Sequence, residues 1–252
     1  MEKYIIANWK MYKTFAEIQQ FANVFESEYK KIDAKNIKCE IAVPSIYLLD
    51  AKKLFKNVEV ISQDAHYAKE GAFTGNISWN QLKDCNIKGS LVGHSERRQF
   101  FNDTDDIIHL QIKALLENEM QAVLCIGETI DEYEKNHTFD VIHNQTLIAL
   151  ENIDKKYFHN LIIAYEPTWA IGTGKIPVAA QIDQLIAQLK QKLSEKYSKD
   201  IIAKIPFLYG GSVNDKNCTD FFKQKNIDGA LVGGFCLKPE NYVQLIKIMK
   251  GI

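Results

Sequence analysis

Short apolar runs alternate along this chain with longer segments that carry an apolar stripe on one side only. The short runs are bounded by Gly, Asn, Pro or charged residues, as expected of strands that are buried on both faces. The expected strands are Tyr4–Ala7, Cys39–Val43, Val58–Ser62, Ser90–Gly93, Ala122–Ile126, Leu161–Tyr165, Ile205–Tyr209 and Gly229–Val232.

The longer segments have the period of amphipathic helices, with apolar residues at i, i+3, i+4 and i+7. Two such stripes are Ile182, Leu185, Ile186, Leu189 and Leu193, and Tyr242, Leu245, Ile246 and Met249. Capping boxes, in which a hydroxyl residue is followed three positions later by Glu or Gln, mark helix starts. They are Thr14 with Glu17, Ser78 with Gln81, and Thr129 with Glu132.

Strands that alternate with helices predict a parallel sheet, which in roughly 250 residues is a closed barrel or an open doubly wound sheet. An open sheet that binds a nucleotide would carry a glycine-rich turn after its first strand. Here that turn is Asn8-Trp9-Lys10-Met11, without glycine. The pattern favours an α/β fold with a single (β/α)₈ barrel. No linker or shift in composition divides residues 1–252 into more than one domain.

Composition and charge limit the classes of function that fit this chain. The chain of 252 residues is 46% hydrophobic and 25% charged, and its 31 basic and 32 acidic residues are interspersed. This balance argues against a nucleic-acid partner, and an anionic ligand would need local groups to attract it.

The N-terminal apolar run is too short for a signal peptide or a membrane span. The five cysteines, widely spaced and without a C-x-x-C motif, are interpreted as reduced core residues rather than disulfides or a zinc site. We therefore expect a cytoplasmic protein with no membrane partner.

In a barrel of this kind, the loops after the strands carry the chemistry. Asn8 and Lys10 follow the first strand and, being two residues apart, point to the same side. His94 ends the fourth strand and precedes Ser95-Glu96-Arg97-Arg98. A helix beginning nearby would keep its imidazole neutral, as a hydrogen-bond donor. The alternatives are a solvated surface lysine and a histidine that merely satisfies its own hydrogen bonds.

The sixth loop is the most informative. Glu166 ends a buried strand, where exposure or a nearby cation must satisfy its carboxylate. The following residues combine a bulky apolar tip with glycines, a composition typical of a lid that excludes water. This lid is Pro167, Thr168, Trp169, Ala170, Ile171, Gly172, Thr173, Gly174 and Lys175. The alternative is a surface loop with an incidental tryptophan.

Paired glycines follow the last two strands, as Gly210-Gly211-Ser212 and as Gly233-Gly234. They leave backbone N–H groups uncovered where this fold usually binds phosphate. The sequence therefore indicates a phosphorylated ligand.

Taken together, these residues resemble the triosephosphate isomerase family along essentially the whole chain, from Asn8-Trp9-Lys10-Met11 to Leu231-Val232-Gly233-Gly234. The most specific parts are the Gly93–Arg98 segment and the Tyr165–Lys175 lid. The resemblance implies a TIM barrel that interconverts dihydroxyacetone phosphate and glyceraldehyde 3-phosphate through an enediolate. It also implies that no metal or organic cofactor takes part.

The resemblance assigns roles to individual residues. Glu166 would be the base that moves a proton between two carbons, and His94 the neutral group that polarises the carbonyl. Lys10 would stabilise the enediolate, Asn8 would help to fix the substrate, and Glu96 would support the site. Backbone donors at Gly172, Ser212, Gly233 and Gly234 would hold the phosphate.

The resemblance further implies a homodimer. The tip formed by Phe73, Thr74 and Gly75 resembles a loop that inserts into a partner subunit, and an apolar tip is poorly solvated in a monomer. Asn76 stands where the family usually has a glutamate that pairs with an arginine such as Arg97 of the other subunit. Pro177 at the lid's far hinge and Phe235 beside the phosphate site also depart from the family. We expect Phe235 to pack against neighbouring structure without blocking the backbone donors.

Two other functions fit the pattern less well. A phosphate-binding barrel enzyme with a different chemical step would need Lys10, His94 and Glu166 by coincidence. A barrel that had lost catalysis and acts as a scaffold would not need these positions filled.

Overall fold

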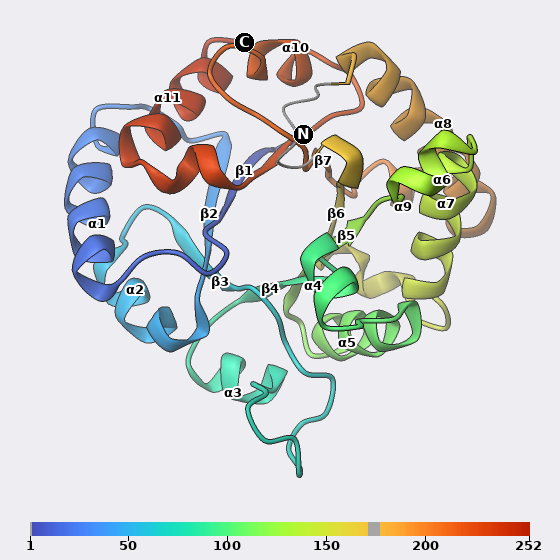
Figure 1. The fold of residues 1–252 in the computed structure, drawn as a ribbon, viewed down its shortest axis with the longest axis horizontal. Helices are drawn as coiled ribbons and strands as arrows, with labels where there is room; N and C mark the ends of the chain where they lie inside the picture. Colours follow the sequence, from blue (N-terminus) through green and yellow to red (C-terminus); the bar gives the residue numbers. More distant parts are fainter. Residues whose placement is uncertain (1, 171–176) are drawn as a thin grey trace.

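The computed structural model describes residues 2–170 and 177–252, and in these ranges eight parallel strands close into a barrel in sequence order (Figure 1). The strands are β1 (Lys3–Asn8), β2 (Ile37–Val43), β3 (Glu59–Ser62), β4 (Gly89–Val92), β5 (Gln121–Ile126), β6 (Leu161–Tyr165), β7 (Phe207–Tyr209) and β8 (Gly229–Val232). The last strand pairs with the first, Tyr4 lying opposite Gly229 and Ala7 opposite Val232. The predicted barrel is confirmed, and the open sheet was the wrong alternative.

Helices surround the barrel (Figure 1). They are α1 (Phe15–Tyr29), α2 (Leu48–Leu54), α3 (Trp79–Asp84), α4 (Ser95–Phe100), α5 (Asp105–Glu117), α6 (Ile130–Glu134), α7 (Thr138–Ala149), α8 (Ala179–Tyr197), α9 (Lys199–Ile202), α10 (Cys218–Phe222) and α11 (Pro239–Lys250). Short 3₁₀ turns are η1 (Ser45–Tyr47), η2 (Lys155–Asn160), η3 (Thr168–Ala170) and η4 (Gly234–Leu237). The three predicted capping boxes are present at α1, α3 and α6. In the part of the chain that the structure describes, no helix has the length and apolar character needed to cross a membrane.

Several strand ends differ from the prediction by one or two residues, and two of these differences have a local cause. The fourth strand ends at Val92 because Gly93 has φ +73°, which is incompatible with extended backbone. The seventh begins at Phe207 because the preceding residue is Pro206, which has no N–H to donate to a neighbouring strand.

The barrel is filled by side chains from alternate strand positions. This inner cluster is Ile6, Ala42, Ile61, Leu91, Val123, Cys125, Ile162, Ala164, Leu208 and Leu231. A larger apolar layer lies between the strands and the helices, and the two stripes on α8 and α11 contribute to it. The five cysteines are free, and all but Cys85 are buried. Since the interior is packed, a ligand can bind only at an end of the barrel.

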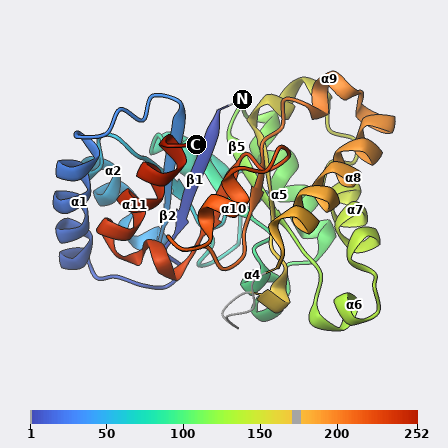
Figure 2. The same ribbon diagram turned by 90° about the horizontal axis from the view of Figure 1, so that it is seen from above.

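Figure 2 shows α4 and α6 at one end of the barrel, with α9 and the C-terminus at the other. Because α4 and α6 follow β4 and β5, the first end holds the carboxyl ends of the strands. All the predicted chemical groups belong to the loops at this end.

After β3 the chain leaves the barrel as an arm, residues 66–78, which projects beyond the ring of helices (Figure 1). Its base is closed by a bridge between His66 and Ser78. Phe73 packs on the His66 ring, with the ring centroids 4.1 Å apart. The tip residues Phe73, Thr74 and Gly75 are exposed.

Candidate active site

A cavity of about 430 Å³ opens at the carboxyl end of the barrel. Its walls include the predicted residues Asn8, Lys10, His94, Glu166, Ser212, Gly233 and Gly234. Phe235 also lines it, half-buried and packed against the apolar layer, as expected. The lid residues Ile171, Gly172, Thr173, Gly174 and Lys175 lie outside the described residues. The structure thus brings together groups that are separated by up to 226 positions in the sequence, from Asn8 to Gly234.

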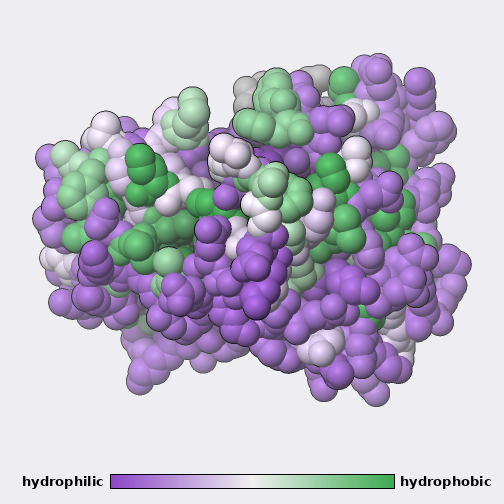
Figure 3. Space-filling model, turned by 90° about the horizontal axis from the view of Figure 1, so that it is seen from below, coloured by the Kyte–Doolittle hydropathy of each residue, from purple (hydrophilic) through white to green (hydrophobic). Residues whose placement is uncertain are grey.

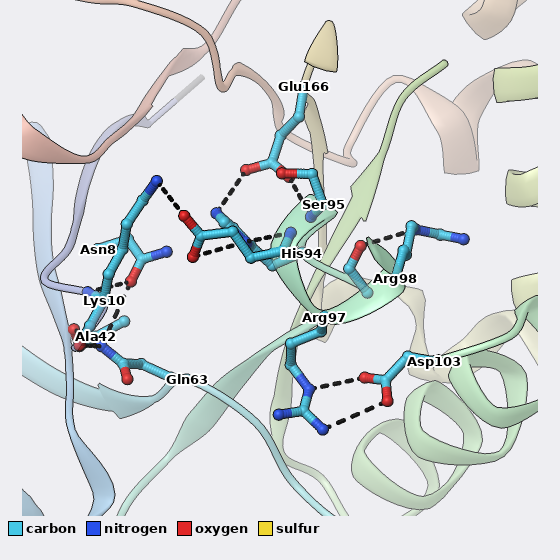
Figure 4. Close-up of polar contacts among 12 residues, drawn as sticks. Asn8, Lys10, Ala42, Gln63, His94, Ser95, Arg97, Arg98, Asp103 and Glu166 are labelled. Carbon is cyan, nitrogen blue, oxygen red and sulfur yellow. Dashed lines mark hydrogen bonds and ion pairs between the residues drawn. The ribbon is translucent and has the colours of Figure 1, made fainter. Parts of the chain in front are cut away.

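Lys10 lies just beyond β1 in an unusual backbone conformation, with φ +50°. Its N–H donates to Asn8 Oδ1 at 2.9 Å, which fixes both residues at the start of the loop. Its Nζ lies 2.6 Å from Glu96 Oε1 (Figure 4). The carboxylate therefore holds the ammonium group at the cavity, and among the described residues the other hydrogens of Nζ have no partner.

His94 is the N-cap residue of α4 and is buried. Its Nδ1 accepts a hydrogen bond from the Glu96 N–H at 3.2 Å. An imidazole nitrogen that accepts cannot carry a proton, so the ring is neutral and its proton lies on Nε2. The helix N-terminus supports the same form, since it disfavours a cation there. His94 can thus act as a hydrogen-bond donor toward the cavity through Nε2.

Glu166 follows β6 directly and is also buried. Its Oε1 lies 3.3 Å from His94 Nε2, and its Oε2 accepts from the Ser95 N–H at 3.1 Å (Figure 4). The Ser95 N–H and the adjacent imidazole place the carboxylate at one side of the cavity. A ligand carbon would be reached by rotation of this side chain.

Close packing around Glu166 explains why position 210 is a glycine. A Cβ at Gly210 would lie only 2.7 Å from Glu166 Cγ. Any larger residue would displace the carboxylate. After the neighbouring strand β8, a Cβ at Gly233 would lie 3.3 Å from Lys10 Cε, whereas the space beside Gly234 is open. The backbone of these two residues is therefore accessible from the cavity, as a phosphate site requires.

Ser212 connects this wall to the base of the lid. Its Oγ donates to the Ala170 carbonyl at 2.8 Å, so its hydroxyl is already engaged. Trp169 donates from Nε1 to Glu128 Oε1 at 2.8 Å and stacks on Tyr133, with ring centroids 4.3 Å apart. The near end of the lid is thus anchored to α6 and to the loop after β5.

Glu128 is the most important residue that the sequence analysis missed. It is fully buried and accepts hydrogen bonds from Trp169, Tyr165 and Thr138. Burial raises the pKa of its carboxyl, and these donors partly oppose that shift. One signal was present in the sequence: like Glu166, it is a carboxylate at the end of a buried apolar strand.

Two arginines fix α4, which carries His94, Ser95 and Glu96 at its start. Arg97 Nε donates to Asp103 at 2.7 Å, and its Nη2 lies 3.1 Å from Asp64. Arg98 binds the carbonyls of Gly93 and Cys125. Arg97 thus already pairs with two carboxylates of its own chain, and Asn76 offers no third charge.

Among residues 2–170 and 177–252, no three His, Cys, Asp or Glu side chains are grouped so that they could hold a metal ion. The groups gathered at the cavity are instead a carboxylate, a neutral imidazole and an ammonium. With uncovered backbone amides beside them, they suit proton transfer on a small phosphorylated carbonyl compound.

Comparisons with known proteins agree with this chemistry. The family model described as triosephosphate isomerase matches residues 3–249. A protein named triosephosphate isomerase from Malacoplasma penetrans (strain HF-2) is 55% identical over 248 residues, which cover 98% of this chain and 99% of that protein. Proteins of the same name from Mycoplasmoides gallisepticum and Alkaliphilus metalliredigens are each 42% identical, over 98% of this chain and 98% and 99% of their own lengths.

Proposed function

This chain belongs to the triosephosphate isomerase family, and we propose that the residues around its cavity carry out that family's reaction. The enzyme interconverts dihydroxyacetone phosphate and D-glyceraldehyde 3-phosphate, a step of glycolysis and gluconeogenesis. The observation that carries the assignment of roles is that Glu166, His94 and Lys10 line one cavity.

Glu166 is the base. Its carboxylate removes a proton from the carbon beside the substrate carbonyl and returns it to the neighbouring carbon. Its burial supports this role, because a carboxylate shielded from water has fewer water molecules to lose before it contacts the reacting carbon. The reaction has no net oxidation, since the electrons of the broken C–H bond remain in the enediolate.

His94 polarises the carbonyl through Nε2–H and then moves protons between the two oxygens of the enediolate. The hydrogen bond from the Glu96 N–H to Nδ1 supports this role because it keeps the proton on Nε2. Lys10 balances the negative charge that develops on the oxygens, and Asn8 fixes the loop that presents it.

The phosphate is held by backbone N–H groups of Ser212, Gly233 and Gly234. The accessible backbone on this wall supports the assignment. Gly172 of the lid would add a further donor. These phosphate contacts orient the substrate, although they are remote from the reacting carbons.

The function can be tested directly with purified protein and dihydroxyacetone phosphate in deuterated water. We expect deuterium at the carbon of the product that receives the returned proton, detected by NMR. Retention of the substrate without exchange would mean a scaffold protein. Exchange without glyceraldehyde 3-phosphate, or with loss of phosphate, would mean a different chemical step.

We also propose a homodimer built on the face from which the arm projects. Figure 3 shows hydrophobic side chains gathered over the upper part of this face, above a hydrophilic lower part. Exposed large apolar residues follow four consecutive strands, β1 to β4: Met11, Tyr12, Ile46, Leu49, Phe73, Phe100 and Phe101. An apolar surface of this kind is typical of a protein interface. In such a dimer Thr74 approaches the partner's Asn8 and His94 loops.

Changing Thr74 to arginine is expected to weaken the dimer by roughly 30-fold or more, because an unpaired charge in an interface costs about 2–5 kcal/mol. Sedimentation velocity over a range of concentrations measures the change. Ala203→Arg adds the same charge at an exposed position directly after α9, at the opposite end of the barrel, and should leave the dimer intact. A monomeric wild type, or equal effects of the two variants, would contradict the proposed interface.

Two further proposals concern the chain as a whole. Residues 1–252 form a single catalytic domain, supported by a barrel whose first and last strands pair directly. The enzyme works in the cytoplasm, supported by five cysteines that are all free.

A further inference from the structure

We propose that Gln63 is a positioning residue for Lys10, holding the backbone conformation that presents the ammonium group to the substrate. The inference rests on the proposed role of Lys10. It concerns a residue that does not line the cavity and that neither the motifs nor the chemistry of the reaction single out.

The conformation of Lys10 needs support from its surroundings. A φ of +50° is in the left-handed region, which is unfavourable for a residue with a Cβ. Such a conformation persists only where neighbouring groups hold it. The Lys10 N–H is held by Asn8 Oδ1 at 2.9 Å, which leaves its carbonyl to be fixed by another group.

Gln63 supplies that group. Its Nε2 donates to the Lys10 carbonyl at 2.8 Å and to the Ala42 carbonyl at 3.1 Å, and it lies 3.4 Å from Asn8 Oδ1 (Figure 4). Among the described residues, no other side chain donates to the Lys10 carbonyl. One amide group thus ties the loop after β1 to β2, from its own place directly after β3.

The position of the carbonyl determines the position of the ammonium group. Rotation about the Lys10 N–Cα bond (φ) moves its carbonyl and its Cβ together, so a carbonyl held in place also holds the direction of the four-carbon chain that ends in Nζ. Nζ now lies 2.6 Å from Glu96, and Cε lies against Gly233. Loss of the Gln63 amide would release the Lys10 carbonyl and allow Nζ to leave this place.

Asp64, the next residue, makes a parallel contact. Its carboxylate lies 3.1 Å from Arg97 Nη2 and accepts from Gln111 Nε2 at 3.1 Å. Since Arg97 belongs to α4, this contact holds the helix whose first turn carries Glu96. The residues that follow β3 thus contact the Lys10 backbone through Gln63, and the helix that carries Glu96 through Asp64. A strand without catalytic residues therefore supports both members of the Lys10–Glu96 pair.

The test compares Gln63→Met with Gln121→Met. Methionine keeps the length and volume of glutamine but removes the donor. Gln121 is a matched control, since its Nε2 donates to Glu40 at 2.7 Å at the other end of the barrel. A misplacement of about 1 Å can cost roughly 10²-fold. We therefore expect kcat/KM to fall by roughly 10- to 100-fold in Gln63→Met, and by less than about threefold in Gln121→Met.

The decisive measurement repeats Gln63→Met in a Lys10→Met background, where no ammonium group remains to be positioned. A residue that acts through Lys10 should then have little further effect, less than about threefold, whereas a general structural role would give the same loss in both backgrounds. Deuterium exchange by NMR registers the slow turnover of these variants. If Gln63→Met does not fold, Gln63→Leu, which also lacks the donor, is measured by the same criteria.

The proposal is overturned by near wild-type activity of the Gln63 variant, by equal losses in the two backgrounds, or by an equal loss in Gln121→Met. An inactive wild type would instead overturn the proposed function, so the two failures are distinguishable.

Discussion

Replacing Glu166 with glutamine is expected to lower kcat by a factor of roughly 10²–10⁴, the usual contribution of a positioned general base. Glutamine has nearly the same shape, and its side-chain oxygen can still accept from the Ser95 N–H that now binds Oε2. The fold should therefore be preserved while the base is lost. Steady-state kinetics and deuterium incorporation from the solvent measure the effect, and thermal unfolding verifies the fold.

Glu166→Asp is the matched variant, because it keeps the carboxylate and withdraws it by about 1 Å, a change that can cost roughly 10²-fold. Activity in this variant should lie between those of the wild type and Glu166→Gln. If Glu166→Gln exchanged deuterium at close to the wild-type rate, a different group would have to be the base.

Replacing Glu40 with glutamine is expected to stabilise the folded chain above pH 7. Glu40 is two residues from Ala42, whose side chain belongs to the cluster inside the barrel, so Glu40 points to the same side. It is buried, and Gln121 donates to its Oε2 at 2.7 Å. Burial raises the pKa of the Glu40 carboxyl to about 7, an effect that Glu59 reinforces and that the Gln121 hydrogen bond and Lys38 oppose.

The sign of the pH dependence follows from that raised pKa. Below pH 4.5 the carboxyl is protonated in both the folded and the unfolded chain, so its burial does not lower the free energy of unfolding. Between pH 4.5 and about 7 the unfolded chain releases the proton first, so the free energy of unfolding falls as pH rises. Above about pH 7 the ionisation of Glu40 has lowered the free energy of unfolding by about 3 kcal/mol.

Urea unfolding at pH 4.5 and pH 8 measures this difference. Glu40→Gln should unfold at a higher urea concentration than the wild type at pH 8, and at a similar concentration at pH 4.5. Glu134→Gln, which makes the same change at an exposed position on α6, should show no such pH-dependent gain. Equal stability of the wild type and Glu40→Gln at pH 8 would mean that the folded chain satisfies the Glu40 charge.

The sequence predicted the barrel because each strand is a compact apolar run whose signal is local. Several strand ends differed from the prediction by one or two residues, and two of them have a clear cause in a single residue, Gly93 through its positive φ and Pro206 through its missing N–H. The positions of Lys10, His94 and Glu166 were predictable for a similar reason, since the ends of parallel strands meet at one end of a barrel.

The groups that hold those residues could not be predicted in this way. Gln63 contacts a carbonyl 53 positions earlier, and Ser95 binds Glu166 through a backbone N–H that has no sequence signature. Such contacts depend on the final distances between loops. The pairing of Arg97 with Asp64 is of the same kind. The reacting residues could therefore be predicted from the sequence, whereas the residues that position them could be identified only in the structure.

The seam between β1 and β8 has a consequence for biosynthesis. The Tyr4 N–H donates to the Asp228 carbonyl at 2.9 Å, so β1 obtains its second neighbour only from β8, which is synthesised more than 200 residues later. Until residues 229–232 have left the exit tunnel, the nascent sheet has two unpaired edges that can capture strands of other chains. Termination of synthesis before residue 229 would leave this gap open. The gap would mark such fragments for aggregation or for quality-control proteases.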